Sequence, residues 1–117
     1  MAEITPQAYA NIREHINNGW TYIELQDDAG NAILRLGSDD ARVSWIHQEG
    51  ATALLRQVVI TGKDTDITLP QTFAKSAIYN VATGGTAFSL ETFNSFTLET
   101  VNDELTIVHE LQIPQVV

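Results

Sequence analysis

The sequence predicts a mainly β fold, an antiparallel β-sandwich of the jelly-roll or Greek-key type that carries one N-terminal α-helix. Three observations support this prediction. Apolar residues recur at helical spacing before residue 19, they alternate with polar residues after it, and turn residues then recur about every 8–12 positions. No linker or internal repeat interrupts the chain, so we expect a single domain over 1–117, with the helix in 1–19 and the sandwich in 20–117.

The helix has a clear start and a single apolar side. Thr5 can cap free backbone N–H groups, and Pro6 suits the first helical position, where its missing N–H costs nothing. We predict a helix over 6–18 that ends at Gly19. The residues of its apolar stripe are Ala8, Tyr9, Ile12 and Ile16. The stripe needs a surface to cover, and we favour the sheet of its own chain over that of a neighbouring subunit.

The rest of the chain consists of short apolar or alternating segments between turns. Strands are predicted over 20–26, 32–36, 42–47, 51–60, 67–69, 72–81, 86–90, 93–100 and 105–113. The segment 72–81 also fits a short helical turn. The last strand has the clearest alternation, and the side chains that face one way are Leu105, Ile107, His109, Leu111 and Ile113.

Composition excludes several classes of function. The net charge is −9, and no Lys or Arg follows Lys75. Phosphate groups are bound mainly through positive charge, so we expect neither nucleic acid nor an anionic membrane surface as a partner. No apolar run is long enough to span a bilayer, and the first residues do not form a secretory signal. The chain has no cysteine, which fits synthesis in the cytoplasm.

No motif indicates an enzyme or a cofactor. The three histidines lack metal-ligand spacing, and we expect His109 to be a buried histidine with a local hydrogen bond. No serine lies in the G-x-S-x-G pattern of hydrolases. Paired carboxylates such as Asp27-Asp28 and Asp64 with Asp66 are interpreted as turn residues, with calcium at the Asp27 turn as a lesser alternative.

The residues 22–36, with the sequence YIELQDDAGNAILRL, resemble hairpins in small structural proteins of tailed bacteriophages. Those proteins are similar in size, acidic, free of cysteine and rich in short strands. The resemblance implies a virion component of the tail, baseplate or head decoration that works as a ring or trimer. It carries over no functional residue.

Our first hypothesis is a non-enzymatic structural module that assembles with itself and with other structural proteins. The expected contact residues are Tyr9, Ile12, Ile16, Val116 and Val117. The alternative hypothesis is a carbohydrate-binding sandwich, with or without calcium, which requires an exposed tryptophan beside polar residues. A small hydrolase built on carboxylates brought together by folding is a third hypothesis.

Overall fold

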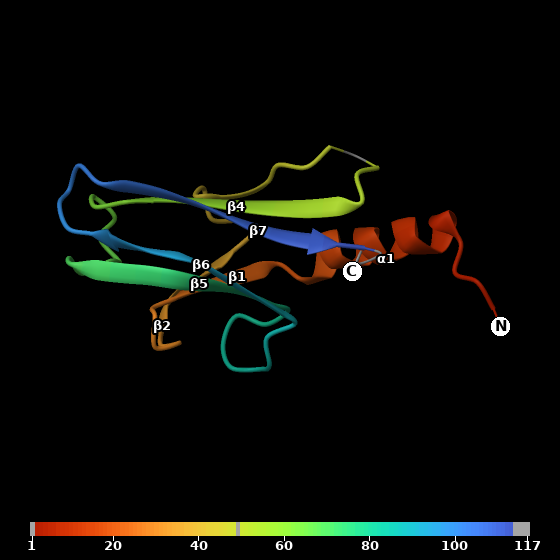
Figure 1. Ribbon diagram of the computed structural model, residues 1–117, viewed down its shortest axis with the longest axis horizontal. Coiled ribbons are helices and arrows are strands. Elements are labelled where there is room, and N and C mark those ends of the chain that lie inside the picture. Colours follow the sequence, from red (N-terminus) through yellow and green to blue (C-terminus); the bar gives the residue numbers. More distant parts are fainter. Residues whose placement is uncertain (1, 49, 114–117) are drawn as a thin grey trace.

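A computed structural model describes residues 2–48 and 50–113 of the chain. One helix and seven strands occur among these residues (Figure 1). They are α1 (Pro6–Gly19), β1 (Tyr22–Gln26), β2 (Ala32–Gly37), β3 (Val43–Trp45), β4 (Ala53–Thr61), β5 (Gln71–Tyr79), β6 (Ser89–Leu98) and β7 (Glu104–Gln112).

The strands form two antiparallel sheets that pack face to face. The first sheet has the order β2-β1-β5-β6 and the second has the order β3-β4-β7. Strands that are distant in sequence therefore pair, β1 with β5 and β4 with β7, through crossovers of the kind that Greek-key sandwiches contain. The predicted fold class, mainly β with two antiparallel sheets and one N-terminal helix, is confirmed.

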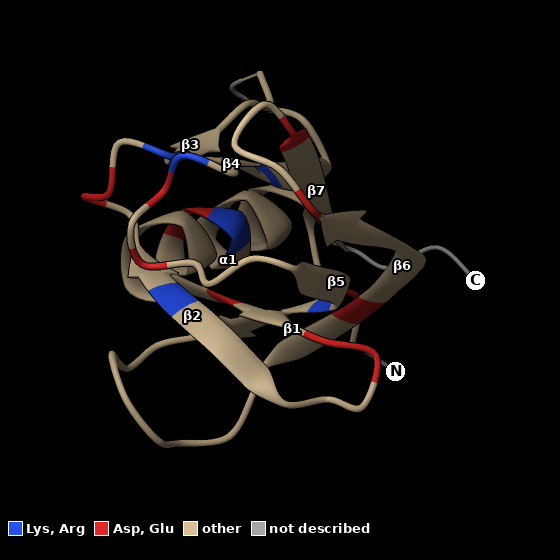
Figure 2. Cartoon of the chain, turned by 90° about the vertical axis from the view of Figure 1, so that its left-hand side faces the viewer, with Lys and Arg blue, Asp and Glu red and all other residues tan. Residues whose placement is uncertain are grey.

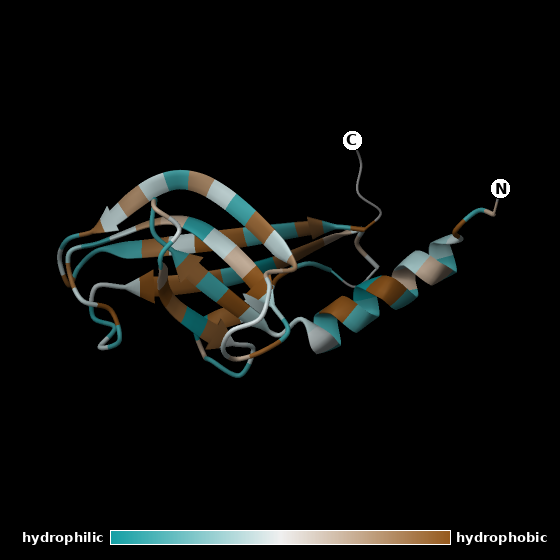
Figure 3. Cartoon of the chain, turned by 90° about the horizontal axis from the view of Figure 1, so that it is seen from below, coloured by the Kyte–Doolittle hydropathy of each residue, from teal (hydrophilic) through white to brown (hydrophobic). Residues whose placement is uncertain are grey.

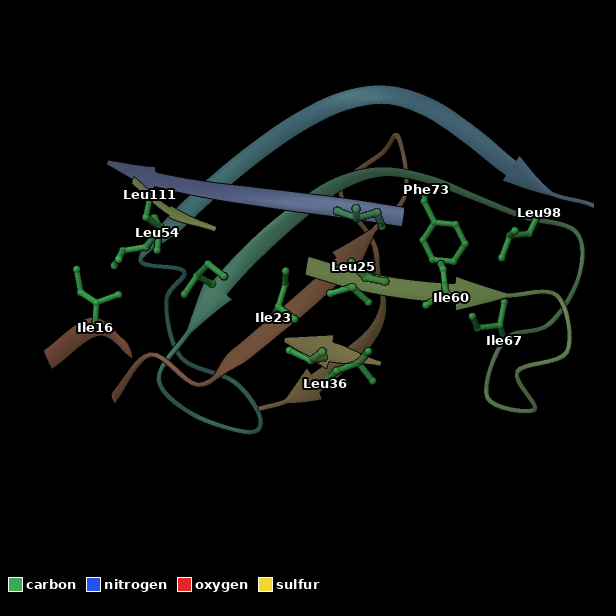
Figure 4. Close-up of a cluster of buried hydrophobic side chains, with 14 residues drawn as sticks. Ile16, Ile23, Leu25, Leu36, Leu54, Ile60, Ile67, Phe73, Leu98 and Leu111 are labelled. Atoms are coloured by element: carbon green, nitrogen blue, oxygen red, sulfur yellow. The ribbon is translucent and has the colours of Figure 1, made fainter. Parts of the chain in front are cut away.

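Alternating side chains of the two sheets make the core. Leu54, Arg56, Val58 and Ile60 of β4 point inward, while the residues between these four are only half-buried. Figure 4 shows the core as one cluster, with Ile16 beside Leu54 and Leu111 at one end and Phe73 and Leu98 near the other.

Two predicted segments differ from the structure. Residues 67–69 form a turn instead of a strand, and Ile67 is nonetheless buried in the core. The predicted strands 86–90 and 93–100 are one strand, β6, which contains a bulge. Phe73 pairs with Phe96 and Lys75 with Thr92, so one residue of β5 lies opposite three of β6. The extra residues bend β6 over the core, which explains why its sequence pattern looks interrupted (Figure 4).

Gly62 holds two turns together at the end of the sandwich opposite the helix. It is buried, its N–H donates to the carbonyl of Asp103, and a Cβ at this position would overlap the carbonyl oxygen of Thr100. We expect Gly62→Ala to lower the free energy of unfolding by about 1–3 kcal/mol, because the neighbouring backbone must move.

Chemical denaturation would measure this loss. Gly19→Ala is the matched control, because Gly19 lies in the helix and a Cβ there would meet only the tip of His15 at 4.0 Å. This control should raise the stability by up to about 1 kcal/mol. Equal effects of the two substitutions would contradict the close approach at Gly62.

Candidate functional site

Helix α1 projects from one end of the sandwich along the long axis of the molecule (Figure 3). The molecule measures 54 × 26 × 26 Å, and the N-terminal turns of α1 extend its longest dimension (Figure 1). The helix begins as predicted, with the Thr5 side chain accepting from the N–H of Ala8 and Pro6 in the first turn. It ends where the N–H of Trp20 donates to the carbonyl of Ile16.

Only the C-terminal part of α1 is anchored to the sandwich. Ile16 is 1% exposed and belongs to the core, and Arg13 donates to the carbonyl of Ile113. The favoured expectation, that the stripe covers the chain's own sheet, holds at Ile16 but not at Ile12, because the helix leaves the sandwich end-on. Ile12 remains 40% exposed, and Tyr9 is half-buried.

The five expected contact residues are thus divided. Tyr9 and Ile12 lie N-terminal to the anchored part of α1, and Ile12 is the more exposed of the two. Ile16 is corrected to a core residue, because it fills the end of the sandwich beside Leu54. Val116 and Val117 lie outside the described residues.

A cleft lies next to the C-terminal end of α1. This Trp20 cleft has a volume of about 430 Å³ and lies between the helix end, the start of β6 and the end of β7. Its lining residues are Trp20, Phe88, Ser89, Leu90, Glu110, Leu111, Gln112 and Ile113. The rings of Trp20 and Phe88 meet at 4.9 Å between centroids with an angle of 58°, and Phe88 is 46% exposed. The cleft therefore combines an aromatic corner with polar groups.

Phe88 lies at the end of the loop 80–88, and Arg35 of β2 anchors this loop through hydrogen bonds. Arg35 donates to the carbonyls of Val81 and Gly84 and forms a 2.7 Å ion pair with Glu24 of β1. Its guanidinium also lies 3.6 Å from the ring centre of Tyr79. At the far end of the loop, the N–H of Phe88 donates to the carbonyl of Ile78. Both ends of the loop are therefore fixed to the first sheet.

A second cleft, of about 580 Å³, separates α1 from the start of β4. Arg13, Glu14, Asn17, Asn18 and His47 are its polar lining residues. The Oδ1 atom of Asn17 is buried and has no hydrogen-bond partner among the described residues. His47, expected at the end of a strand, follows β3 and accepts from the N–H of Leu55.

Behind the Trp20 cleft, His109 lies in the core between two hydroxyl groups. Its Nδ1 is 2.7 Å from Ser76 Oγ and its Nε2 is 2.8 Å from Ser89 Oγ, so the predicted buried histidine with local hydrogen bonds is confirmed. Burial and the nearby charge of Arg56 lower the pKa of His109 to about 4. General bases work best with a pKa near the working pH, and both ring nitrogens face serines instead of an orienting carboxylate. The cluster therefore differs from a Ser-His-Asp triad, and it links β5, β6 and β7 through hydrogen bonds.

Arg56 of β4 is the unusual member of the core. It is 0% exposed, and none of its guanidinium nitrogens has a hydrogen-bond partner among the described residues. The group lies 3.9 Å from the ring centre of Trp45, and burial lowers the pKa of Arg56 to about 10. Arg56 covers one face of the Trp45 ring, so that face is not free to stack on a ligand.

The paired carboxylates serve turns, as the turn interpretation predicts. Asp27 accepts from the N–H groups of Ala29 and Asn31, which lowers the pKa of Asp27. Arg42 forms ion pairs with three carboxylates, those of Asp40, Asp64 and Asp66. No group of three or more possible metal ligands occurs over residues 2–48 and 50–113.

Sequence reasoning anticipated the helix surface and the histidine but missed the Trp20 cleft and Arg56. Neither tryptophan is fully exposed, and the most exposed aromatic ring of the cleft belongs to Phe88. A signal for Arg56 was present, because it sits between Leu54 and Val58 at the inward positions of an alternating strand. The cleft is formed by three segments that are distant in sequence, so no local sequence pattern predicts it.

Within the part of the chain that the structure describes, no helix is long and apolar enough to cross a membrane. No protein-family model matches the sequence, and comparison with curated proteins and with solved structures found no match.

Proposed function

We propose that this protein is a non-enzymatic structural module that assembles through α1, with a second copy of the same chain as the partner. The observation that carries the proposal is the projecting helix (Figure 3), on which Ile12 is 40% exposed and Tyr9 is only half-buried. Contacts with other structural proteins belong to the same proposal.

The first support is the helix itself. Isolated helices shorter than about 12–15 residues are marginal in water, and most helices gain their stability from packing of the apolar face. Helix α1 has 14 residues, and its described tertiary contacts involve the C-terminal part. Packing against a partner helix would stabilise the N-terminal turns. Ile4, just before the helix, adds a further side chain that is 55% exposed.

The second support is the charge of this segment. Residues 4–12 contain no charged side chain, although the chain carries a net charge of −9. Two copies can therefore bring these segments together without placing like charges in contact. Two-fold contacts between identical surfaces are the commonest form of homo-oligomer, which favours a second copy as the partner. The virion setting of the proposal rests on the resemblance of residues 22–36 to phage hairpins.

We expect sedimentation velocity at micromolar concentration to find a dimer or larger oligomer, and Ile12→Ser to shift it toward monomer. The substitution removes an apolar side chain from the stripe while leaving the core residue Ile16 in place. Asn11→Ser is the matched control, because Asn11 is exposed in the same helix turn but lies outside the apolar stripe, and it should leave the association unchanged.

Circular dichroism of each variant would verify that the sandwich is still folded. A wild-type chain that sediments as a monomer throughout the concentration range would overturn the proposal. Equal weakening by Ile12→Ser and Asn11→Ser would also contradict it, since the effect would then not come from the apolar stripe.

A further inference from the structure

We propose that the Trp20 cleft binds a neutral saccharide, with one sugar ring against Trp20 and Phe88 and its hydroxyl groups on Glu110, Gln112 and Ser89. This inference concerns a site on the sandwich and does not depend on assembly through α1.

The aromatic corner supplies an apolar surface for a sugar ring. Trp20 and Phe88 meet at an angle of 58°, so the two rings form adjoining walls instead of a closed stack. Phe88 is 46% exposed and Leu90 is 68% exposed, which leaves apolar surface open to a ligand. The C–H face of a sugar can cover such a surface while its hydroxyl groups stay hydrated or bonded.

The opposite side of the cleft supplies polar groups from a single strand. Glu110 and Gln112 are alternate residues of β7, so their side chains lie on the same face of one strand. A carboxylate accepts two hydrogen bonds from neighbouring hydroxyl groups, and an amide both donates and accepts. The volume of about 430 Å³ lies within the range of small-ligand pockets, roughly 300–1,000 Å³.

Ser89 is oriented from the core by His109. The Ser89 hydroxyl is 2.8 Å from Nε2 of His109, while Nδ1 of the same ring is 2.7 Å from the Ser76 hydroxyl. In a neutral imidazole one nitrogen donates and the other accepts, so the two serines take opposite roles. Because one bond occupies only part of the capacity of a hydroxyl group, Ser89 retains a donor or an acceptor for a ligand in the cleft.

The charge around the cleft disfavours an anionic ligand. Glu110 lines the cleft, and the carboxylate of Glu91 on β6 accepts from the N–H of Glu110. Both strands lack Lys and Arg, and Figure 2 shows acidic residues but no basic ones on β6 and β7. Phosphorylated or carboxylated sugars would meet repulsion there, so the proposal is limited to neutral saccharides.

Fluorine NMR of protein labelled with 5-fluorotryptophan would test this inference. Trp45→Phe assigns the two signals, and common neutral hexoses, N-acetylhexosamines and their short oligomers are titrated up to millimolar concentration. We expect at least one saccharide to move the Trp20 signal saturably. The Trp45 signal serves as an internal control, because Trp45 does not line the cleft.

Phe88→Ala should weaken that affinity about tenfold, since it removes one wall of the aromatic corner. Phe96→Ala is the matched control, because Phe96 is 39% exposed on β6, the strand that follows Phe88, but does not line the cleft. A Trp20 signal unmoved by every saccharide would overturn the inference. An affinity that survives Phe88→Ala, or that falls equally in Phe96→Ala, would overturn it as well.

Discussion

Replacing Arg56 with methionine is expected to raise the free energy of unfolding by about 1–3 kcal/mol. Arg56 is buried without a hydrogen-bond partner in the described residues, and burial lowers its pKa from 12.5 to about 10. A basic group whose pKa is lower in the folded protein than in the unfolded chain makes the folded state less stable at every pH below its folded pKa. This shift corresponds to a cost of about 3 kcal/mol at neutral pH.

The gain should be smaller than this cost because Arg56 also interacts favourably with Trp45. The guanidinium lies 3.9 Å from the ring centre, and a desolvated cation–π contact contributes up to about 2 kcal/mol. Methionine keeps an unbranched side chain and can contact the ring through its sulfur and methyl groups. It is two bonds shorter than arginine, and the space that it leaves unfilled reduces the gain further. The net effect should therefore be a stabilisation.

Thermal denaturation at pH 7 would measure the effect, with an expected rise in the melting temperature of roughly 3–6 °C per kcal/mol. Arg56→Lys is the matched control, because it keeps a buried positive charge and loses the flat group that stacks on Trp45. Lysine should therefore not stabilise the protein. A methionine variant that melts below the wild type would show that the guanidinium stabilises the core.

The fold follows from local signals where those signals are strong. Thr5 and Pro6 define the helix start, and the alternation of residues 105–113 defines β7 with the correct inward face. Sequence alone does not determine that β5 lies between β1 and β6, because that order depends on contacts between distant residues. The bulge in β6 cannot be predicted for the same reason, because it is defined by the pairing of β6 with β5.

The candidate sites were predictable to a smaller extent. The apolar stripe of α1 was identified from the sequence. How much of the stripe the sandwich covers depends on tertiary structure, which buries Ile16 and leaves Ile12 exposed. The Trp20 cleft depends on the position of the loop 80–88, which is set by Arg35 from another strand. Such contacts across long sequence separations have no periodic pattern that sequence reasoning can use.

The second large expected effect is on the pH dependence of stability. We expect the wild-type protein to lose about 3 kcal/mol of stability as the pH falls from 6.5 to 4, and His109→Gln to remove most of this loss. Burial lowers the pKa of His109 from 6.5 to about 4, with a smaller contribution from Arg56. Between these two values the unfolded chain binds a proton that the folded protein excludes. Stability therefore falls as the pH falls through this window and levels off below pH 4.

Other shifted groups affect this window little or in the opposite direction. Hydrogen bonds lower the pKa values of Asp27, Asp40, Asp66 and Asp103, so these groups reduce stability mainly below their usual value of 3.8. Burial and Glu110 raise the pKa of Glu91, which makes stability rise as the pH falls. The range from pH 6.5 to 5 is therefore where the effect of His109 should be clearest.

Urea denaturation at a series of pH values would test the prediction. Glutamine can still bond the hydroxyl groups of Ser76 and Ser89 but does not titrate, so its stability profile should be nearly flat above pH 5. NMR titration of the His109 ring offers a direct measurement and should find a midpoint well below 6.5. In Arg56→Met that midpoint should move upward, because one of its two causes has been removed. A midpoint near 6.5 in the wild type would contradict this account of the core.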